Sequence, residues 1–272
     1  MSLLYDFSGK VALVTGSSSG IGAATAILFA KSGGLQHHCP ALRCFHSLHA
    51  KQCLNVSPKG LKALEVVADV TRDEDLIRLV DTTVKEFGKI DILVNCAGSA
   101  SGAAVIGDTS YINNFRQVLK TNLDSYVFLT HICVKHLEKT KGNIVNISSV
   151  RSTQTAPSMS AYCMSKSALD MFTKCIAVEL GNKGIRVNSV NPGATKTNLP
   201  QAAGASDDDA QAFYDAFARL YPVGRYAVGE DIANAVLYLS SNESSFITGS
   251  VLVADGGHLA ANVGSEPYKD LK

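Results

Sequence analysis

The stretch 11-VALVTGSSSGIG-22 decides the fold. Its first four residues are aliphatic and predict a buried strand, and the helical run 23-AATAILFAK-31 follows it. Between them, glycines 16, 20 and 22 let the backbone turn tightly, and the N-terminus of the helix offers free N–H groups and a partial positive charge. The stretch therefore predicts a strand, a phosphate-binding loop and a helix. Taken alone, the motif is also compatible with a plain strand-to-helix turn.

The same alternation of strand and helix continues along the chain. Short, nearly continuous apolar runs predict further strands in 65-EVVADV-70, 91-DILVNCAG-98, 142-GNIVNISS-149, 184-GIRVNSVNPG-193 and 250-SVLVADGG-257. Apolar residues at helical spacing follow a capping-box pattern at 71–74 and predict a helix that ends at Gly88. The same spacing predicts helices near 111–138, 160–180 and 229–240. Such strands are expected in a parallel sheet covered on both faces. The chain is thus predicted to form an α/β, doubly wound parallel sheet of the Rossmann type.

The domain organisation follows from the same pattern. We expect a single domain over 1–257, without an internal repeat or an interdomain linker. Residues 198–222 are polar, interrupt the alternation, and are expected to form a mobile substrate loop at the carboxyl edge of the sheet. Residues 258–272 are expected to form a loose C-terminal tail.

Composition limits the classes of partner. The chain has 272 residues, 46% of them hydrophobic, and a formal net charge of +1, which gives no indication of a nucleic-acid partner. No apolar run approaches the ~20 residues that a membrane span needs, and the N-terminus lacks the pattern of an export signal. The seven cysteines are odd in number and scattered, which favours reduced thiols and a cytoplasmic location.

Tyr162 and Lys166 form the first candidate catalytic pair. They are four residues apart in a predicted helix and therefore share one face. A nearby cation lowers the pKa of a tyrosine, which then can act as a general acid or base on a carbonyl or an alcohol. The hydroxyl of Ser149, at the end of a predicted strand, could bind the developing oxyanion. The pair alone also fits an ordinary helix surface, but Ser149 and Asn122 extend the pattern.

These elements resemble the short-chain dehydrogenase/reductase family, the type with TGxxxGxG and YxxxK motifs. The resemblance covers about 10–32 and 61–257, with the motifs in family order. They are Thr15-Gly16-x3-Gly20-x-Gly22, Asp69-Val70, Asn95-Cys96-Ala97-Gly98, Asn122, Ser149, Tyr162-x3-Lys166, Asn191-Pro192-Gly193 and Asp255-Gly256-Gly257. One departure is Cys96, where the family often has asparagine.

The resemblance implies an NAD(P)-dependent oxidoreductase that interconverts a carbonyl and a secondary alcohol by hydride transfer. Tyr162 would be the acid/base, Lys166 would tune it and hold the nicotinamide ribose, Ser149 would orient the substrate oxygen, and Asn122 would support a water relay. The implied cofactor-binding residues are Thr15, Gly16, Ser18, Ser19, Gly20, Ile21, Gly22, Asp69, Val70, Asn95, Ala97, Gly98, Tyr162, Lys166, Pro192, Gly193, Thr195 and Thr197.

The resemblance also implies partners. The substrate would be a small molecule bound by residues 99–111, 151–160 and 198–222, whose side chains do not identify it. No metal is required, and the chain would assemble as a homo-oligomer, a tetramer or a dimer, with 247-ITGSVLVADGG-257 resembling an interface segment.

Residues 33–60 depart from this pattern. The second strand is expected at about 34–45, between the first and third strands in the order 3-2-1-4-5-6-7, but Pro40 falls where that strand should be central. No acidic residue lies between Asp6 and Glu65, so the usual ligand of the ribose 2′-hydroxyl is missing. Its place falls on Pro40 and the neighbouring place on Ala41. Arg43 is near enough to meet a 2′-phosphate, which favours NADP over NAD.

Three interpretations of this stretch remain open. It is a diverged but working strand and helix, the product of a shifted and restored reading frame, or a zinc site. Ligands for zinc would come from Cys39, Cys44, His46, His49 and Cys53. If the second strand fails, the alternative function is a catalytically impaired family member that acts as a binding or assembly subunit.

Overall fold

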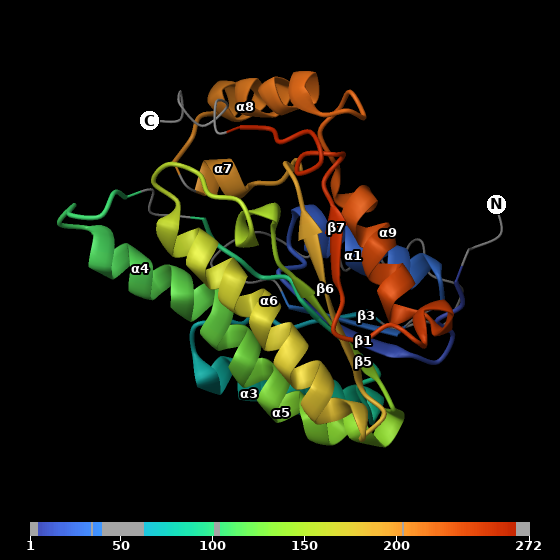
Figure 1. The fold of residues 1–272 in the computed structure, drawn as a ribbon. Helices are drawn as coiled ribbons and strands as arrows, with labels where there is room; N and C mark the ends of the chain where they lie inside the picture. Colours follow the sequence, from blue (N-terminus) through green and yellow to red (C-terminus); the bar gives the residue numbers. More distant parts are fainter. Residues whose placement is uncertain (1–4, 34, 40–62, 101–103, 203, 265–272) are drawn as a thin grey trace.

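A single parallel sheet organises the molecule (Figure 1). The computed structural model describes residues 5–33, 35–39, 63–100, 104–202 and 204–264. Seven strands lie in the order β3-β2-β1-β4-β5-β6-β7, and every neighbouring pair is parallel. The strands are β1 Val11–Thr15, β2 Leu35–Cys39, β3 Ala63–Glu65, β4 Ile92–Asn95, β5 Asn143–Ile147, β6 Arg186–Pro192 and β7 Val251–Ala254. The predicted single-domain, Rossmann-type α/β fold and its strand order are confirmed.

Helices cover both faces of this sheet. Figure 1 shows α1 and α9 on one face and α3, α5 and α6 on the other. The long helices are α1 Gly20–Lys31, α3 Asp73–Phe87, α4 Tyr111–Leu119, α5 Ser125–Thr140, α6 Ser160–Gly181, α8 Asp207–Leu220 and α9 Gly229–Ser240. The short helical segments are η1 Lys120–Asp124, η2 Val150–Ser152, α7 Leu199–Ala202 and η3 Asn242–Ser244.

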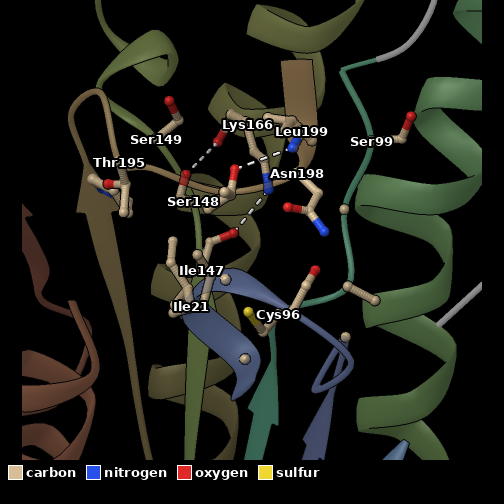
Figure 2. Close-up of a pocket in the computed structure, with 18 of the residues that line it drawn as sticks. Ile21, Cys96, Ser99, Ile147, Ser148, Ser149, Lys166, Thr195, Asn198 and Leu199 are labelled. Carbon is tan, nitrogen blue, oxygen red and sulfur yellow. Dashed lines mark hydrogen bonds between the residues drawn. The ribbon is translucent and has the colours of Figure 1, made fainter. Parts of the chain in front are cut away.

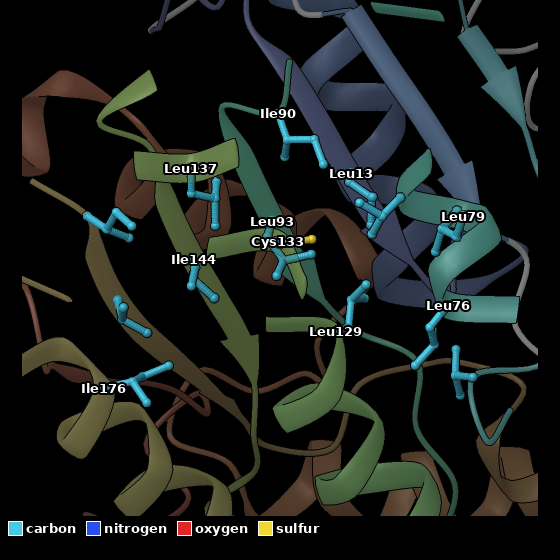
Figure 3. Close-up of a cluster of buried hydrophobic side chains, with 14 of the residues drawn as sticks. Leu13, Leu76, Leu79, Ile90, Leu93, Leu129, Cys133, Leu137, Ile144 and Ile176 are labelled. Atoms are coloured by element: carbon cyan, nitrogen blue, oxygen red, sulfur yellow. The ribbon is translucent and has the colours of Figure 1, made fainter. Parts of the chain in front are cut away.

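Alternation along the strands divides the core in two. Successive strand side chains point to opposite faces, so Leu13 and Leu93 belong to one cluster while Val14 and Val94 belong to the other. The first cluster packs against α3, α5 and α6 through residues such as Leu76, which Figure 3 draws together with Leu13 as members of this cluster. The second cluster packs against α1 and α9. Burial on both faces explains why the strand sequences are nearly continuous apolar runs.

The second strand forms despite its unusual sequence. β2 pairs with β1 at Leu35↔Val11 and with β3 at Gln36↔Ala63. The expectation that Pro40 interrupts its centre is wrong, because β2 ends at Cys39. A ladder needs only main-chain N–H and C=O groups, and the five residues before Pro40 supply them. Nothing observed supports the impaired-subunit alternative. Ala41, Arg43 and the zinc candidates other than Cys39 lie outside the described residues.

The third strand and the following helix differ in detail from the sequence prediction. β3 ends at Glu65, where the predicted strand began, although Val66, Ala68 and Val70 remain buried. Thr71 does not cap α3: the helix follows Arg72, and the Thr71 hydroxyl donates instead to Asp69 Oδ1 at 2.7 Å. α3 ends at Gly88 with φ +77°, as the sequence predicted.

The polar stretch 198–222 covers the carboxyl ends of the strands. Residues 198–222 contain α7 and α8, which lie above the tip of β6 in Figure 1. The described part of the predicted tail is anchored at two residues. His258 is 1% exposed and Val263 is 5% exposed, and Val263 joins Phe217 and Tyr221 in an apolar cluster. The residues between them at 260–262 are exposed, and 265–272 lie outside the described residues.

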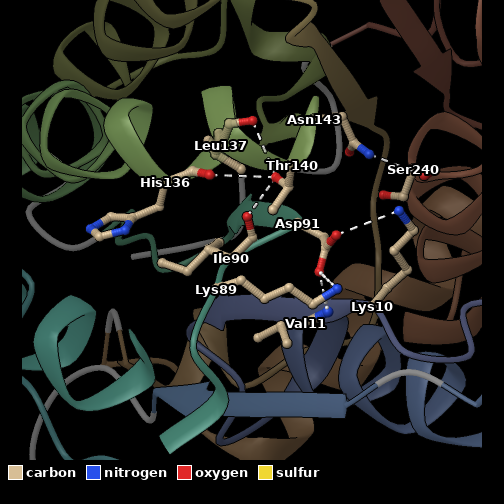
Figure 4. Close-up of polar contacts among 10 residues, drawn as sticks. All are labelled: Lys10, Val11, Lys89, Ile90, Asp91, His136, Leu137, Thr140, Asn143 and Ser240. Carbon is tan, nitrogen blue, oxygen red and sulfur yellow. Dashed lines mark hydrogen bonds and ion pairs between the residues drawn. The ribbon is translucent and has the colours of Figure 1, made fainter. Parts of the chain in front are cut away.

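The amino edge of the sheet is closed by a buried carboxylate (Figure 4). Asp91 accepts a hydrogen bond from Val11 N at 2.8 Å and ion-pairs with Lys10 at 3.4 Å and Lys89 at 3.0 Å. Its side chain is 4% exposed. The contacts tie the start of β1 to the start of β4 and fix the register of the two central strands.

Candidate active site

The phosphate loop needs its glycines for close packing. Gly16 has φ +69°, and a Cβ there would lie 2.8 Å from Ala97 Cα, in the loop after β4. A Cβ on Gly22 would lie 2.4 Å from the Gly16 carbonyl oxygen. α1 begins at Gly20 after Ser19, whose side chain makes no capping hydrogen bond. The first N–H groups of α1 are therefore placed to bind a phosphate.

A cavity of about 490 Å³ opens beside this loop. It lies at the carboxyl ends of the neighbouring strands β1 and β4, from which the strand order runs outward in opposite directions, the usual place for a nucleotide in such sheets. Figure 2 shows Cys96 at the bottom, Thr195 and Ser149 on the left, and Ser99 on the right. Most predicted site residues line it: Gly16, Ser18, Ser19, Gly20, Ile21, Gly22, Ala97, Gly98, Ser149, Tyr162, Lys166, Pro192, Gly193, Thr195 and Thr197.

Two other predicted residues support the cavity from behind. Thr15 is buried, and its Oγ1 accepts hydrogen bonds from Cys96 N at 2.9 Å and Ala97 N at 3.1 Å. Asn95 is buried and donates to Asn146 Oδ1 at 2.9 Å. The Thr15 contacts hold the loop after β4 against the end of β1, and the Asn95 contact joins β4 to β5 behind the cavity.

Asp69 and Val70 are also outside the cavity lining. Asp69 Oδ1 accepts hydrogen bonds from the main-chain N and the hydroxyl of Thr71, at 2.9 and 2.7 Å. The Val70 side chain is 2% exposed and packs in the first core cluster. Their side chains therefore brace the turn between β3 and α3.

Lys166 is a buried cation at the wall of the cavity. Its Nζ donates a hydrogen bond to Ile147 O at 2.8 Å, drawn in Figure 2, and the residue is 3% exposed. Burial lowers the pKa of its ammonium from 10.5 to about 8, which still leaves it mostly charged at neutral pH. Nζ lies 5.7 Å from the centre of the Tyr162 ring and 5.4 Å from that of Tyr126. A cation this near can stabilise negative charge that develops on Tyr162 during a reaction.

Asn122 sits in a π-helical turn between α4 and α5. Its Oδ1 accepts from Ser99 N and its Nδ2 donates to Ser99 O, both at 2.8 Å, and Nδ2 also reaches Ser165 Oγ at 3.3 Å. A Cβ on Gly98 would lie 3.5 Å from Asn122 Oδ1 and 3.9 Å from Lys166 Nζ. The widened turn thus brings Asn122 beside Lys166, as π-turns often do at functional sites.

Ser149 lies after the end of β5, facing the cavity. Its Oγ accepts a hydrogen bond from Arg151 N at 3.1 Å, and its O–H remains able to donate toward a substrate oxygen. The preceding hydroxyl, Ser148 Oγ, donates to Lys166 O at 3.3 Å and fixes the helix that carries Lys166.

Sequence reasoning missed three residues that line this cavity, Cys96, Ile147 and Ser148, and it had placed three others, Ser99, Asn198 and Leu199, in the ranges expected to bind substrate. All are within two residues of a predicted site residue, and that proximity is the signal that could have found them. Burial raises the pKa of the Cys96 thiol to about 12, so it is uncharged at neutral pH.

A second cavity, of about 260 Å³, adjoins the first. The two share Ser149, Tyr162 and residues of the loop after β6. All three ranges expected to bind substrate contribute to the second cavity, and His258, which was not predicted, also lines it. Ser149 and Tyr162 therefore stand at the junction between the larger and the smaller cavity.

Comparisons with known proteins agree with this geometry. A family model described as enoyl-(acyl carrier protein) reductase matches residues 16–258. The (+)-borneol dehydrogenase 2 of Salvia officinalis is 36% identical, covering 96% of this chain and 93% of its own length. The L-rhamnose 1-dehydrogenase (NADP(+)) of Thermoplasma acidophilum is 33% identical, covering 94% of this chain and 98% of its own length.

A solved structure shows the same fold. A short-chain dehydrogenase/reductase of unknown function from Caenorhabditis elegans, determined with cofactor, superposes with a TM-score of 0.87 at 37% identity, covering 96% of this chain and 98% of that one. The chain belongs to the short-chain dehydrogenase/reductase family, whose named members here are dehydrogenases.

Among the residues that the structure describes, no group of three or more His, Cys, Asp or Glu side chains is arranged to hold a metal ion. None of the helices in that part of the chain is long and apolar enough to cross a bilayer.

Proposed function

We propose that this chain is an NAD(P)-dependent oxidoreductase that interconverts a carbonyl and a secondary alcohol, with Tyr162 as the acid/base. The observation that carries the proposal is the placement of Tyr162 beside the buried Lys166 ammonium, on the cavity that the phosphate loop also lines. Tyr162 would transfer a proton at one end of the cavity, and the phosphate loop at the other end would bind a pyrophosphate.

The residues present fit a dinucleotide. Gly16 and Gly22 leave room that a Cβ would fill, and the N-terminus of α1 favours a negative charge there. Pro192, Gly193, Thr195 and Thr197 would hold the nicotinamide end. When bound, the nicotinamide supplies or accepts the hydride at the substrate carbon.

The side chains of this protein handle the proton. In reduction, the Tyr162 hydroxyl gives its proton to the carbonyl oxygen as the carbon accepts the hydride; in oxidation it takes the proton from the alcohol. The Lys166 ammonium stabilises the phenolate that remains, and the Ser149 hydroxyl donates a hydrogen bond to the substrate oxygen. Asn122, beside Lys166, would support the return of a proton from solvent.

A matched pair of tyrosine variants tests this function. Tyr162→Phe removes the proposed acid, and turnover of ketones or secondary alcohols with NADPH, NADH, NADP or NAD should fall about a hundredfold or more. Tyr126→Phe makes the same change at a hydroxyl that is buried without a hydrogen-bond partner, and it keeps the ring near Lys166. Its turnover should match that of the unchanged protein. Equal activity of the two variants would contradict the role of Tyr162.

We propose NADP as the favoured cofactor, with NAD as the alternative. The absence of any acidic residue between Asp6 and Glu65 supports this choice, because an acid at the end of the second strand usually binds the free 2′-hydroxyl of NAD. The name of the Thermoplasma relative is also consistent with it. The ratio of the two dissociation constants tests the preference, and tighter binding of NADH would reverse it.

We further propose a homo-oligomer, a tetramer or a dimer, in the cytoplasm. Exposed apolar side chains lie seven residues apart along α6, at Met164, Met171 and Val178, and Phe246 is fully exposed near β7. An apolar stripe at this spacing suits packing against a second copy. Light scattering of Val178→Glu should show a smaller species than the unchanged protein, and a monomeric unchanged protein would contradict the proposal.

A further inference from the structure

The walls of the second cavity are mainly hydrocarbon. Met159, Leu199, Pro200 and Phe213 line it, together with Val150 and the Tyr214 ring. Phe213 is held by edge-on contacts with Phe217 and Tyr214, with ring centres 4.9 and 5.5 Å away. This wall is therefore built from fixed apolar surface contributed by α7, α8 and the segment before α6.

The phenol in this wall is engaged inside the protein. Tyr214 OH donates to Thr197 O and accepts from Thr197 N, both at 3.2 Å. Burial raises the pKa of Tyr214, so it stays neutral. The Tyr214 hydroxyl thus holds the loop after β6, and the Tyr214 ring lines the cavity.

Arg151 Nη1 and both ring nitrogens of His258 are engaged in the same way. Arg151 Nη1 donates to Gln154 Oε1 at 2.9 Å and to Thr155 O at 2.8 Å. His258 Nε2 lies 2.5 Å from the same Gln154 oxygen, and Nδ1 lies 3.1 Å from Tyr221 OH. Because Gln154 Oε1 can only accept, Nε2 carries the proton and Nδ1 accepts from Tyr221.

The network closes without leaving His258 a donor for substrate. Tyr221 OH accepts from Ala194 N at 2.6 Å, and Gln154 Nε2 donates to Val263 O at 2.9 Å, which fixes the amide orientation. Burial lowers the pKa of His258 to about 4, so the ring is neutral at physiological pH. These polar groups shape the cavity, and three further hydroxyl residues, Ser158, Thr195 and Thr197, also line it.

The volume indicates the size of ligand that the cavity would surround. A cavity of 260 Å³ corresponds to roughly nine waters of liquid volume, which suits a molecule of roughly ten non-hydrogen atoms. It lies just below the usual range of about 300–1,000 Å³ for ligand pockets. The ligand must also place one oxygen at Ser149 and Tyr162, where the two cavities meet.

We infer that the substrate is a compact apolar cyclic ketone or secondary alcohol, of the size of a bicyclic monoterpenoid, and not a sugar. The inference rests on the proposed function. A sugar would bury several hydroxyls against hydrocarbon walls and already engaged polar groups, and an unsatisfied hydroxyl in such a site is unfavourable. An apolar ring gains from leaving water, and its single oxygen meets the two catalytic hydroxyls.

Turnover and binding together test this class. The kcat/KM values for borneol and camphor are compared with those for L-fucose and L-rhamnose, and calorimetry measures binding of each to the complex with oxidised or reduced cofactor. We expect the apolar pair to lead by about a hundredfold or more and to bind where the sugars do not. Turnover or binding of a sugar at least as good would overturn the substrate class while upholding the oxidoreductase. Failure of both apolar probes to bind a cofactor-loaded protein would also overturn it, whereas failure of the cofactor itself to bind would contradict the proposed function.

Paired variants of α8 locate the specificity. Phe213→Asn places an amide in the apolar wall and should lower kcat/KM for borneol by about tenfold or more. Leu220→Asn makes a comparable change on an exposed residue of the same helix, outside the cavity, and should stay within about twofold. Met159→Gln, nearly equal in shape, repeats the test if Phe213→Asn does not fold. Unchanged borneol kinetics in the folded variants would overturn the inference.

Discussion

The two edges of the sheet bury charged groups that serve different purposes. At the amino edge, the Asp91 carboxylate meets Lys10, Lys89 and the Val11 N–H, beside a small hollow of about 80 Å³. At the carboxyl edge, the Lys166 ammonium is held by the neutral carbonyl of Ile147 beside a cavity of about 490 Å³. The first arrangement stabilises the fold, and the second leaves a charge in place for chemistry.

The largest expected effect of a change at the carboxyl edge is on activity. Lys166→Met removes the cation that favours the Tyr162 phenolate, and we expect kcat to fall by about a hundred- to ten-thousandfold. Circular dichroism should show the fold retained, because an apolar side chain of similar length fills the same space. A loss of less than tenfold in a folded variant would remove the distinction between the two edges.

The same residue gives stability an unusual dependence on pH. The folded pKa of Lys166, about 8, lies below its ordinary value of 10.5. The unfolded chain therefore binds more protons between these values, and stability rises with pH across that window. The shift corresponds to about 3 kcal/mol, which burial of the charged form costs below pH 8. Denaturant unfolding at pH 7.5 and 9.5 should show the unchanged protein gaining stability relative to Lys166→Met, a difference in which the opposing effect of buried thiols such as Cys96 cancels; parallel curves would contradict it.

At the amino edge, we expect a substitution to lower stability without lowering activity. Asp91→Ala leaves two lysines and the Val11 N–H without their partner, and we expect about 2 kcal/mol of lost stability. The value is held low because the lysine side chains are 46% and 40% exposed. In the folded variant, kcat should stay within about twofold. A large drop in kcat at unchanged stability would show that the edges are not separate in function.

The smallest effect concerns the π-turn that joins support to chemistry. Asn122→Ala removes the two hydrogen bonds to Ser99 and the contact with Ser165. We expect kcat/KM to fall about tenfold, since the wall beside Lys166 loosens while Tyr162 and Lys166 remain. Asn122→Asp restores only the hydrogen-bond acceptor and should recover part of the loss in kcat/KM. No change in either variant would limit Asn122 to a dispensable brace.

Local patterns predicted the parts of the fold that local chemistry controls. The phosphate loop, the stop at Gly88 and the bounds of α9 follow from glycine and apolar spacing, and the structure has them where they were expected. The position of β2 did not follow, because its pairing with β1 and β3 sets the register and places the strand before Pro40. Pairing of this kind depends on several segments of the chain and cannot be predicted from one segment alone.

The candidate site divides in the same way. Tyr162 and Lys166 are one helical turn apart, so their proximity could be predicted from spacing. His258 and Gln154 are 104 residues apart, and their contact depends on α8 and the C-terminal segment folding over the sheet. The π-turn at Asn122 was also missed, because the helical spacing of 111–138 reads as one helix.

The central claim is that the carboxyl edge binds a nicotinamide dinucleotide, and a fluorescence titration with NADPH and, separately, NADH tests it most directly. The chain has no tryptophan, so the reduced nicotinamide itself provides the signal. Gly22→Ala is the matched control, since its added Cβ would lie 2.4 Å from the Gly16 oxygen and should weaken binding at least about tenfold. We predict micromolar binding of at least one cofactor, tighter for NADPH. A folded protein that binds neither would contradict the account.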